Sequence, residues 1–192
     1  MAEIKSALEI ALEKAERLGR ASKEELLQDK YQEKGRQIAV KYLKEEAELE
    51  EELAKLPPEA QDKAQQAVKE VLLRNVALPR DEVLDPRAVR ALEGLLLVAS
   101  NKKAMAQLKK EVEQLWQQFL LARNTALQQL KASFSQQLRG VTQALEAQLG
   151  QRVRVEVEYL PQFQEEWRKF ETSLIQQYEP ILEDYKAGML RL

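Results

Sequence analysis

The sequence predicts an all-α protein, built as an elongated helical bundle or coiled coil. Apolar residues recur every three or four positions along nearly the whole chain, which is the spacing of one face of an α-helix. Only 6 glycines and 6 prolines interrupt the 192 residues. A chain of this length fits one domain, so we treat it as a single unit.

The first 56 residues are expected to form an N-terminal helical hairpin or arm. A first apolar stripe ends at Gly19, a residue type that can terminate a helix; its members are Ile4, Leu8, Ala11, Ala15 and Leu18. Ser22 and Glu25 match a capping box, in which each side chain satisfies a free backbone N–H group. A second helix is therefore expected from Lys23 to about Lys55.

Prolines mark the next boundaries. Pro57–Pro58 ends the second helix and opens a short helix over residues 57–78, because proline is favoured in the first turn. Residues 79–85 form a linker loop. Asp85–Pro86 combines an N-cap residue with a proline at the first helical position, so a long helix is expected over 86–150.

The longest apolar stripe lies on one long helix, about 104–149. Its positions first follow a heptad spacing and then, from Leu127, an eleven-residue repeat. A helix over these residues would span about 70 Å, whereas a compact globule of this size is roughly 40 Å across. Either the helix breaks, near Asn124 or Gly140, or the molecule is elongated. We favour the elongated form, with the stripe covered by the N-terminal helices or by a second copy.

Within an extended segment, 151–160, charged and apolar residues alternate over 152–159, which predicts a short strand. Two copies paired antiparallel about Val155 would place opposite charges across the ladder. The facing pairs would be Arg152 with Glu158 and Arg154 with Glu156. Pairing within the chain, or an irregular extended link, are the alternatives. Pro161 then opens a C-terminal helical segment, 161–192.

The residue inventory argues against catalysis. The chain contains no histidine and no cysteine, so it has no Ser-His-Asp triad, Cys–His pair, zinc finger or disulfide. The scattered glycines form no phosphate-binding loop. Neighbouring carboxylates, such as Glu165–Glu166, come with no sign of a cleft. We therefore expect a non-enzyme with no catalytic, cofactor-binding or metal-ligating residues and no cofactor.

The location expected from the sequence is the cytoplasm. The N-terminus shows no uninterrupted apolar segment of the kind found in secretory signals. The longest apolar run, Leu95 to Ala99, is far shorter than the roughly 20 residues of a membrane-spanning helix. No membrane contact is expected.

The function expected from these patterns is that of a scaffold or adaptor acting through helix–helix contacts, with itself as a homodimer and with an unidentified protein. Trp116 and Phe119, like Trp167 and Phe170, are three residues apart on one helical face, a pattern more typical of core than of a ligand cage. The proposed contact residues are Leu115, Phe119, Leu127, Phe134, Leu138, the segment Arg152 to Glu158, Trp167 and Phe170.

A second hypothesis is weak nucleic-acid or ribosome-associated binding. Residues 114–145 contain no acidic side chain, and their cations, Arg123, Lys131 and Arg139, are eight residues apart among many glutamines. Such a surface could contact an acidic helix or a phosphate backbone. Three cations are fewer than the six or more phosphate contacts of a typical binder, which disfavours nucleic acid.

The opening Ala2-Glu-Ile-Lys-Ser-Ala-Leu-Glu-Ile-Ala-Leu-Glu-Lys-Ala-Glu-Arg-Leu-Gly19 and the ending Val153-Arg-Val-Glu-Val-Glu-Tyr-Leu-Pro-Gln-Phe-Gln-Glu-Glu-Trp167 resemble a small, uncharacterised family of bacterial helical proteins. That family has no assigned activity, so the resemblance implies an all-helical fold and no catalytic residue. In length and helical winding the chain is also loosely similar to stalk subunits of rotary ATPases.

Overall fold

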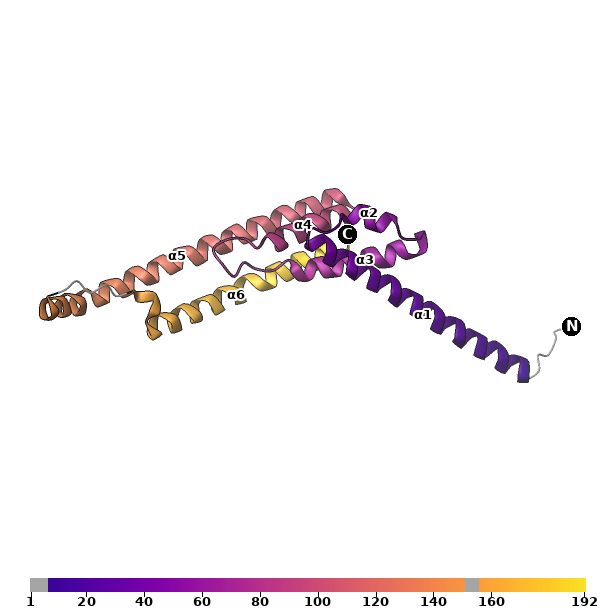
Figure 1. Ribbon diagram of the computed structural model, residues 1–192, viewed down its shortest axis with the longest axis horizontal. Helices are drawn as coiled ribbons and strands as arrows, with labels where there is room; N and C mark the ends of the chain where they lie inside the picture. The colour runs from indigo at the N-terminus through magenta and orange to yellow at the C-terminus, as the bar shows by residue number, and fades with distance from the viewer. Residues whose placement is uncertain (1–6, 151–155) are drawn as a thin grey trace. The chain divides into compact units, whose positions relative to one another are not determined.

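All regular structure in the described residues is helical, which confirms the all-α prediction. The computed structural model describes the backbone of residues 7–150 and 156–192, and their side chains from residue 25 on except at 141, 145 and 149 (Figure 1). The helices are α1 (Ala7–Leu43), α2 (Leu49–Ala54), α3 (Pro58–Asn75), α4 (Pro86–Val98), α5 (Lys102–Leu149), the 3₁₀ turn η1 (Val157–Tyr159) and α6 (Pro161–Leu190). No described helix is long and apolar enough to cross a membrane.

The N-terminal helices differ from the prediction. α1 continues through Gly19 and Lys23 without a break, because one glycine inside a helix costs only about 1 kcal/mol. It ends at Leu43 instead of continuing to Lys55. Glu45 adopts a left-handed φ of 62° there, a position where glycine is usual, and α2 is a separate short helix.

The predicted helix over 86–150 is also divided. α4 ends at Val98, and the side chain of Asn101 caps a new helix by accepting a hydrogen bond from the backbone N–H of Ala104 at 3.1 Å. Asparagine is among the best N-cap residues, so this local bond favours a new start over continuation. α5 then includes Asn124 and Gly140 and ends before Gly150, whose φ is 64°.

The chain separates into two compact units, where its length predicts a single domain. Unit 1 consists of residues 1–75 and 90–100, and unit 2 of residues 76–89 and 101–192. The boundary falls inside α4, so a division by contacts does not follow the order of the chain. A periodicity analysis along the sequence could not locate it.

Unit 1 is built from helices that pack through small residues. Gly35 of α1 lies against the backbone of Ala64 in α3, and the side chains of Tyr42 and Leu72 both reach Gly94 of α4. These contacts follow the same order along α1 and α3, so the two helices run in the same direction. The short helix α2 lies on the path that returns the chain between them (Figure 1).

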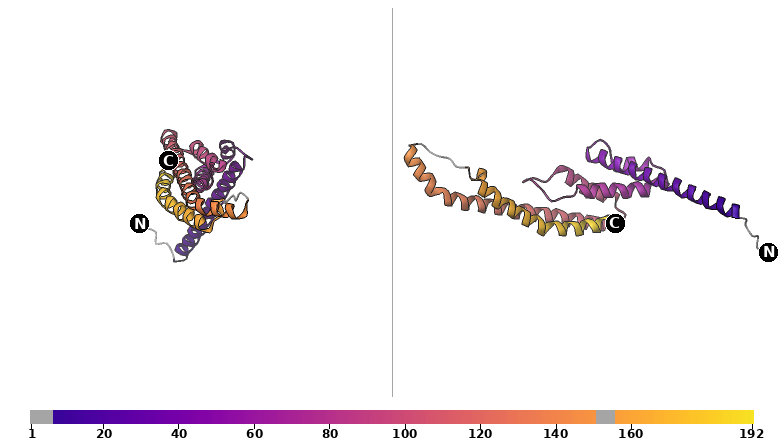
Figure 2. Two further views of the ribbon diagram at one scale, coloured as in Figure 1. Left: turned by 90° about the vertical axis from the view of Figure 1, so that its left-hand side faces the viewer. Right: turned by 90° about the horizontal axis from the view of Figure 1, so that it is seen from below.

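Unit 2 contains a helical hairpin. α5 and α6 lie side by side and antiparallel in both views (Figures 1 and 2). Leu108 contacts Gly188 near one end of the pair, whereas Phe134 contacts Phe163 near the other. The apolar stripe of α5 is therefore covered by α6 of the same chain, not by the N-terminal helices as predicted. α6 itself continues through Pro180.

The strand predicted over 152–159 is not seen. Residues 151–155, which include Arg152 and Arg154, lie outside the described residues. In the described part, the backbone N–H of Tyr159 donates to the carbonyl of Glu156 at 3.2 Å, which forms a 3₁₀ turn. Val157 is buried. Burying this side chain in the hairpin favours a local turn over an extended ladder.

Candidate functional site

The predicted seam residues of α5 lie in the interior of the hairpin. Leu115 and Phe119 are buried, and Phe119 meets Tyr178 of α6 edge-on with ring centroids 5.4 Å apart. Phe134 meets Phe163 in the same way, also at 5.4 Å. Leu127 and Leu138 are half-buried. The hydrophobic pattern thus identified a packed face correctly, but its occupant is the protein's own C-terminal helix.

The aromatic anchors of α6 are less buried than those of α5. Trp167 is half-buried and stacks on Phe170 with centroids 5.7 Å apart, while Phe170 is 37% exposed. Trp116, by contrast, is 1% exposed. The rings of Trp167 and Phe170 stack on each other, which leaves no gap between them for a ligand.

Two of the three predicted phosphate contacts are ion-paired inside the hairpin. Arg123 donates to Glu171 from Nε at 3.0 Å and from Nη2 at 2.8 Å, and its guanidinium lies over the ring of Trp167 at 5.4 Å. Lys131 lies 2.8 Å from Glu158. Arg139 is exposed. The first two cations are therefore neutralised by carboxylates that follow them by some 30 to 50 residues, a pairing that no local pattern reveals.

The acidic half of the predicted strand has a different role from the expected one. The hydrogen bond from Lys131 holds the pKa of Glu158 below its usual value. Glu156 is exposed and begins the 3₁₀ turn. Glu158 thus fixes the hairpin connection to α5, whereas the prediction paired it with Arg152 of a second copy.

The surface feature that the sequence analysis did not isolate is the outer face of α5. Between residues 114 and 137, twelve residues of this helix are exposed and none of them is charged; seven are glutamines. We call this set the neutral face: Gln114, Gln117, Gln118, Leu121, Thr125, Gln128, Gln129, Ala132, Ser133, Ser135, Gln136 and Gln137. Leu121 is 70% exposed.

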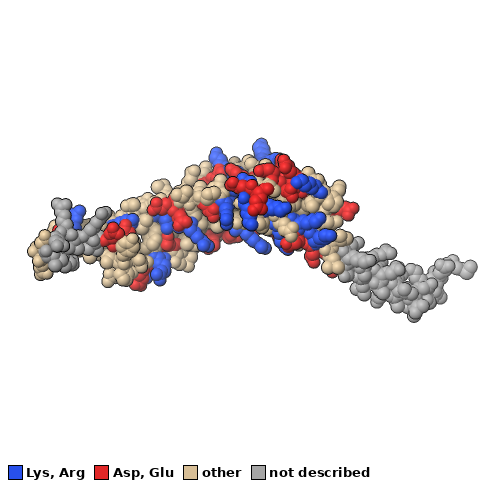
Figure 3. Space-filling model, in the orientation of Figure 1, with Lys and Arg blue, Asp and Glu red and all other residues tan. Residues whose placement is uncertain are grey.

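The neutral face contrasts with the solvent side of its partner helix. In α6, seven of the twenty exposed residues are charged. Acidic and basic side chains are interspersed on the face of the molecule in Figure 3, with no large patch of one sign. The acid-free stretch in the sequence was the available signal. It needed the inward orientation of Arg123 and Lys131 to become a continuous neutral surface.

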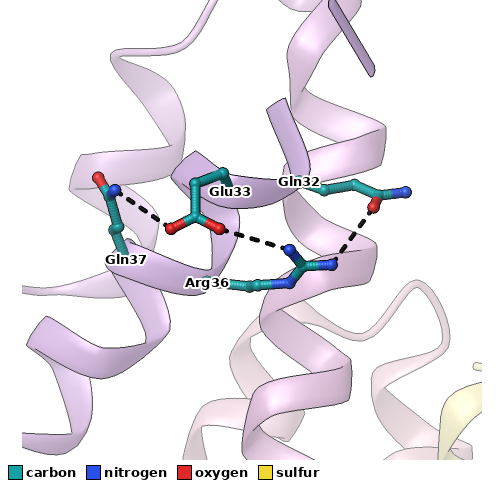
Figure 4. A network of polar contacts seen from close by, with 4 residues as sticks. All are labelled: Gln32, Glu33, Arg36 and Gln37. Atoms are coloured by element: carbon teal, nitrogen blue, oxygen red, sulfur yellow. Dashed lines mark hydrogen bonds and ion pairs between the residues drawn. The ribbon is translucent and has the colours of Figure 1, made fainter. Parts of the chain in front are cut away.

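In unit 1, the polar groups form structural contacts. Figure 4 shows Gln32, Glu33, Arg36 and Gln37 joined along one exposed side of α1, with Arg36 3.4 Å from Glu33. All these bonds link residues three or four apart, which is typical of a solvated helix surface.

A second polar cluster closes the end of α1. Arg90 of α4 donates from Nε to the backbone carbonyl of Tyr42 at 2.6 Å, and its guanidinium lies 4.3 Å from the centre of the Tyr42 ring. Its Nη2 is also 3.8 Å from Glu48. Burial raises the pKa of the Tyr42 phenol, and the nearby charge of Arg90 opposes that rise. This arrangement caps a helix end.

Unit 1 also has one open groove of about 390 Å³ between α2, α3 and the end of α4. Gln61 and Gln65 line it, and both side chains donate to backbone carbonyls, of Leu56 and Val98 respectively. Glu50 is its only titratable residue. Within the described part of the chain, no group of three or more His, Cys, Asp or Glu residues could hold a metal ion.

The fold and its surface define an all-α protein whose most distinctive feature is a helical hairpin with one neutral side. Residues 50–191 match the model of a family of unknown function, DUF6657, and the chain belongs to this family. The match covers α2 to α6 and confirms the resemblance to an uncharacterised family. The comparisons with curated proteins and with solved structures find no match.

Proposed function

We propose that this protein is a non-catalytic scaffold or adaptor of the cytoplasm, which acts through helix–helix contacts made by the neutral face of α5. The observation that carries the proposal is the absence of charge from all twelve exposed residues of this face. Soluble surfaces usually hold about 25–35% charged residues. Depletion of charge is the compositional signature of the buried centre of a protein interface.

The energetics of desolvation support this reading. Moving a charged side chain out of water without a partner is far more costly than moving an amide or hydroxyl that can re-form its hydrogen bonds. Glutamine carries both a donor and an acceptor, so a glutamine-rich helix can exchange water for a protein partner at little net cost. An exposed Leu121 at the middle of this face adds apolar area to the contact.

The hairpin is a suitable support for such a surface. Phe119, Phe134 and Arg123 fix α5 to α6 through ring contacts and an ion pair on the opposite side of the helix. The neutral face is thus presented by a helix whose inner contacts are already made. A partner helix adds to this surface by coiled-coil packing without opening the hairpin.

Photo-crosslinking in cells that make the protein tests the proposal. A photoreactive amino acid at Gln118 or Gln128 of the neutral face is expected to give discrete covalent adducts with a protein. The same amino acid at Gln176 or Gln177, exposed on α6, is the matched control and is expected to give few. Equal labelling from both helices, or no adducts from α5, would contradict the proposal.

A further inference from the structure

We infer that the neutral face binds the neutral face of a second copy of this chain, with the two α5 helices antiparallel and related by a two-fold axis at Thr125. The inference rests on the proposed function and names its partner. It differs from the strand pairing predicted around Val155, because the contact is made by a helix whose exposed side chains are described.

The spacing of the face is symmetric about Thr125. Positions 4, 7, 11 and 14 residues away from it lie along one side of α5 in both directions, and all but Glu111 are exposed. The eight steps cover 28 residues, a mean of 3.5 residues per step, which is the repeat of a left-handed coiled coil. An antiparallel two-fold pair requires that a seam read the same from both ends, and this one does.

The residues brought together by this axis are compatible in size and polarity. Leu121 faces Gln129 of the second copy, and Gln118 faces Ala132. The small side chains of Ala132 and Thr125 permit close approach of the two helices near the axis. No charged side chain is placed in the centre of the contact, where it would lose water without gaining a partner.

The ends of the seam make the antiparallel direction specific. Gln114 faces Gln136 of the second copy, an amide pair that satisfies donor and acceptor. Beyond it, Glu111 faces Arg139, so one attractive charge pair forms at each end. Glu111 accepts a hydrogen bond from Gln107 at 2.9 Å, which leaves its second carboxylate oxygen for the arginine. A parallel pair would instead set Arg139 against Arg139.

This charge pattern favours a second copy over an acidic or basic partner. A charged helix laid on the neutral face would bury its charges against amides without counter-ions. The chain's own α5 offers a neutral surface of the same length, about 42 Å over 28 residues, with complementary charges at both ends. The area thus matches over its whole length only in the antiparallel register.

Crosslinking of single-cysteine variants tests the geometry, because the chain contains no cysteine of its own. With a short bis-maleimide, purified Thr125→Cys is expected to form a covalent dimer. Gln114→Cys alone is expected to stay monomeric on a denaturing gel, whereas mixing it with Gln136→Cys produces a crosslinked dimer. Ser173→Cys, exposed on α6, is the control that gives none. Self-crosslinking of Gln114→Cys, or none by Thr125→Cys, would overturn the inference.

Charge reversal provides a second readout. Glu111→Arg and Arg139→Glu each place like charges at both ends, so each is expected to weaken the dimer about tenfold in sedimentation equilibrium, and the double variant to restore it. A wild-type chain that is monomeric at micromolar concentration would overturn the inference. If such a monomer still gives adducts with another protein at Gln118 in cells, the proposed function stands; if the cells give no adducts either, both fall.

Discussion

Gly35 of α1 and Ala64 of α3 touch through their backbones: a Cβ atom on Gly35 would lie 2.8 Å from the Cα of Ala64 and closer still to its carbonyl oxygen. Helix propensity alone predicts that Gly35→Ala stabilises α1 by about 1 kcal/mol. The contact reverses the sign, because backbone atoms cannot rotate away as a side chain can. We expect a net loss of about 1–3 kcal/mol in the free energy of unfolding, measured by urea unfolding with far-UV circular dichroism.

Gly140→Ala is the matched control for that variant. Gly140 is an exposed glycine inside α5, and a Cβ atom there would meet no atom within 4 Å. The same substitution is therefore expected to stabilise α5 by up to about 1 kcal/mol. If both variants changed stability in the same direction, the close approach of α1 and α3 would not be the determining contact.

Arg90 is expected to be essential to the stability of unit 1. Arg90→Ala removes a charged donor from the carbonyl of Tyr42 and a cation from the face of its ring, which should cost about 1.5–3 kcal/mol. Arg90→Lys should recover part of this loss, since an ammonium cannot reproduce the planar contact. Arg87→Ala, an exposed neighbour in α4, is the control and should stay within about 0.5 kcal/mol. Equal effects at both arginines would contradict the capping role.

The sequence could predict the helices and several of their ends, because these depend on neighbouring residues. α3, α4 and α6 begin at Pro58, Pro86 and Pro161, and α5 ends before Gly150, all residue types with a fixed backbone preference. The continuation of α1 through Gly19 depended on a balance of about 1 kcal/mol, which a pattern cannot decide.

The partner of each face could not be predicted in the same way. Periodicity shows that Phe119 and Phe134 share an apolar face, but it carries no information on whether α6 or a second chain covers that face. The ion pairs of Arg123 and Lys131 join residues far apart in the chain, so their inward orientation followed only from the fold. The neutral outer face of α5 is a consequence of that orientation.

The ion pair between Arg123 and Glu171 should stabilise the hairpin more than a surface pair does. The two side chains are only 13% and 31% exposed, and the guanidinium also covers Trp167. In a double-mutant cycle of Arg123→Met and Glu171→Gln, we expect a coupling of about 1–2 kcal/mol. Urea unfolding followed by tryptophan fluorescence measures it, because Trp116 and Trp167 both lie in the hairpin. Lys169 and Glu165, an exposed pair, are the control and should couple by less than about 0.5 kcal/mol. A coupling no larger than that of the control would show that burial adds nothing.

The contact between Lys131 and Glu158 should make the hairpin connection sensitive to acid. The hydrogen bond from Lys131 holds the pKa of Glu158 below its ordinary value of 4.5. Because the pKa is lower in the folded chain, the pair contributes its full stability above about pH 4.5 and loses it as the pH falls through the lowered pKa. Lys131→Met should return the pKa of Glu158 toward 4.5, which NMR titration of the side-chain carboxyl carbon measures.

The same substitution should also flatten the pH dependence of unfolding below pH 4.5, since the proton uptake by Glu158 on unfolding is then removed. Lys110→Met changes the charge of an exposed position on the same helix and serves as the control, with the Glu158 pKa unchanged. Raising the salt concentration should weaken the effect of Lys131 in the wild-type chain, because Glu158 is well exposed to solvent. A Glu158 pKa that does not respond to loss of Lys131 would mean that the ion pair is absent in solution and that Val157, not Glu158, holds the turn against α5.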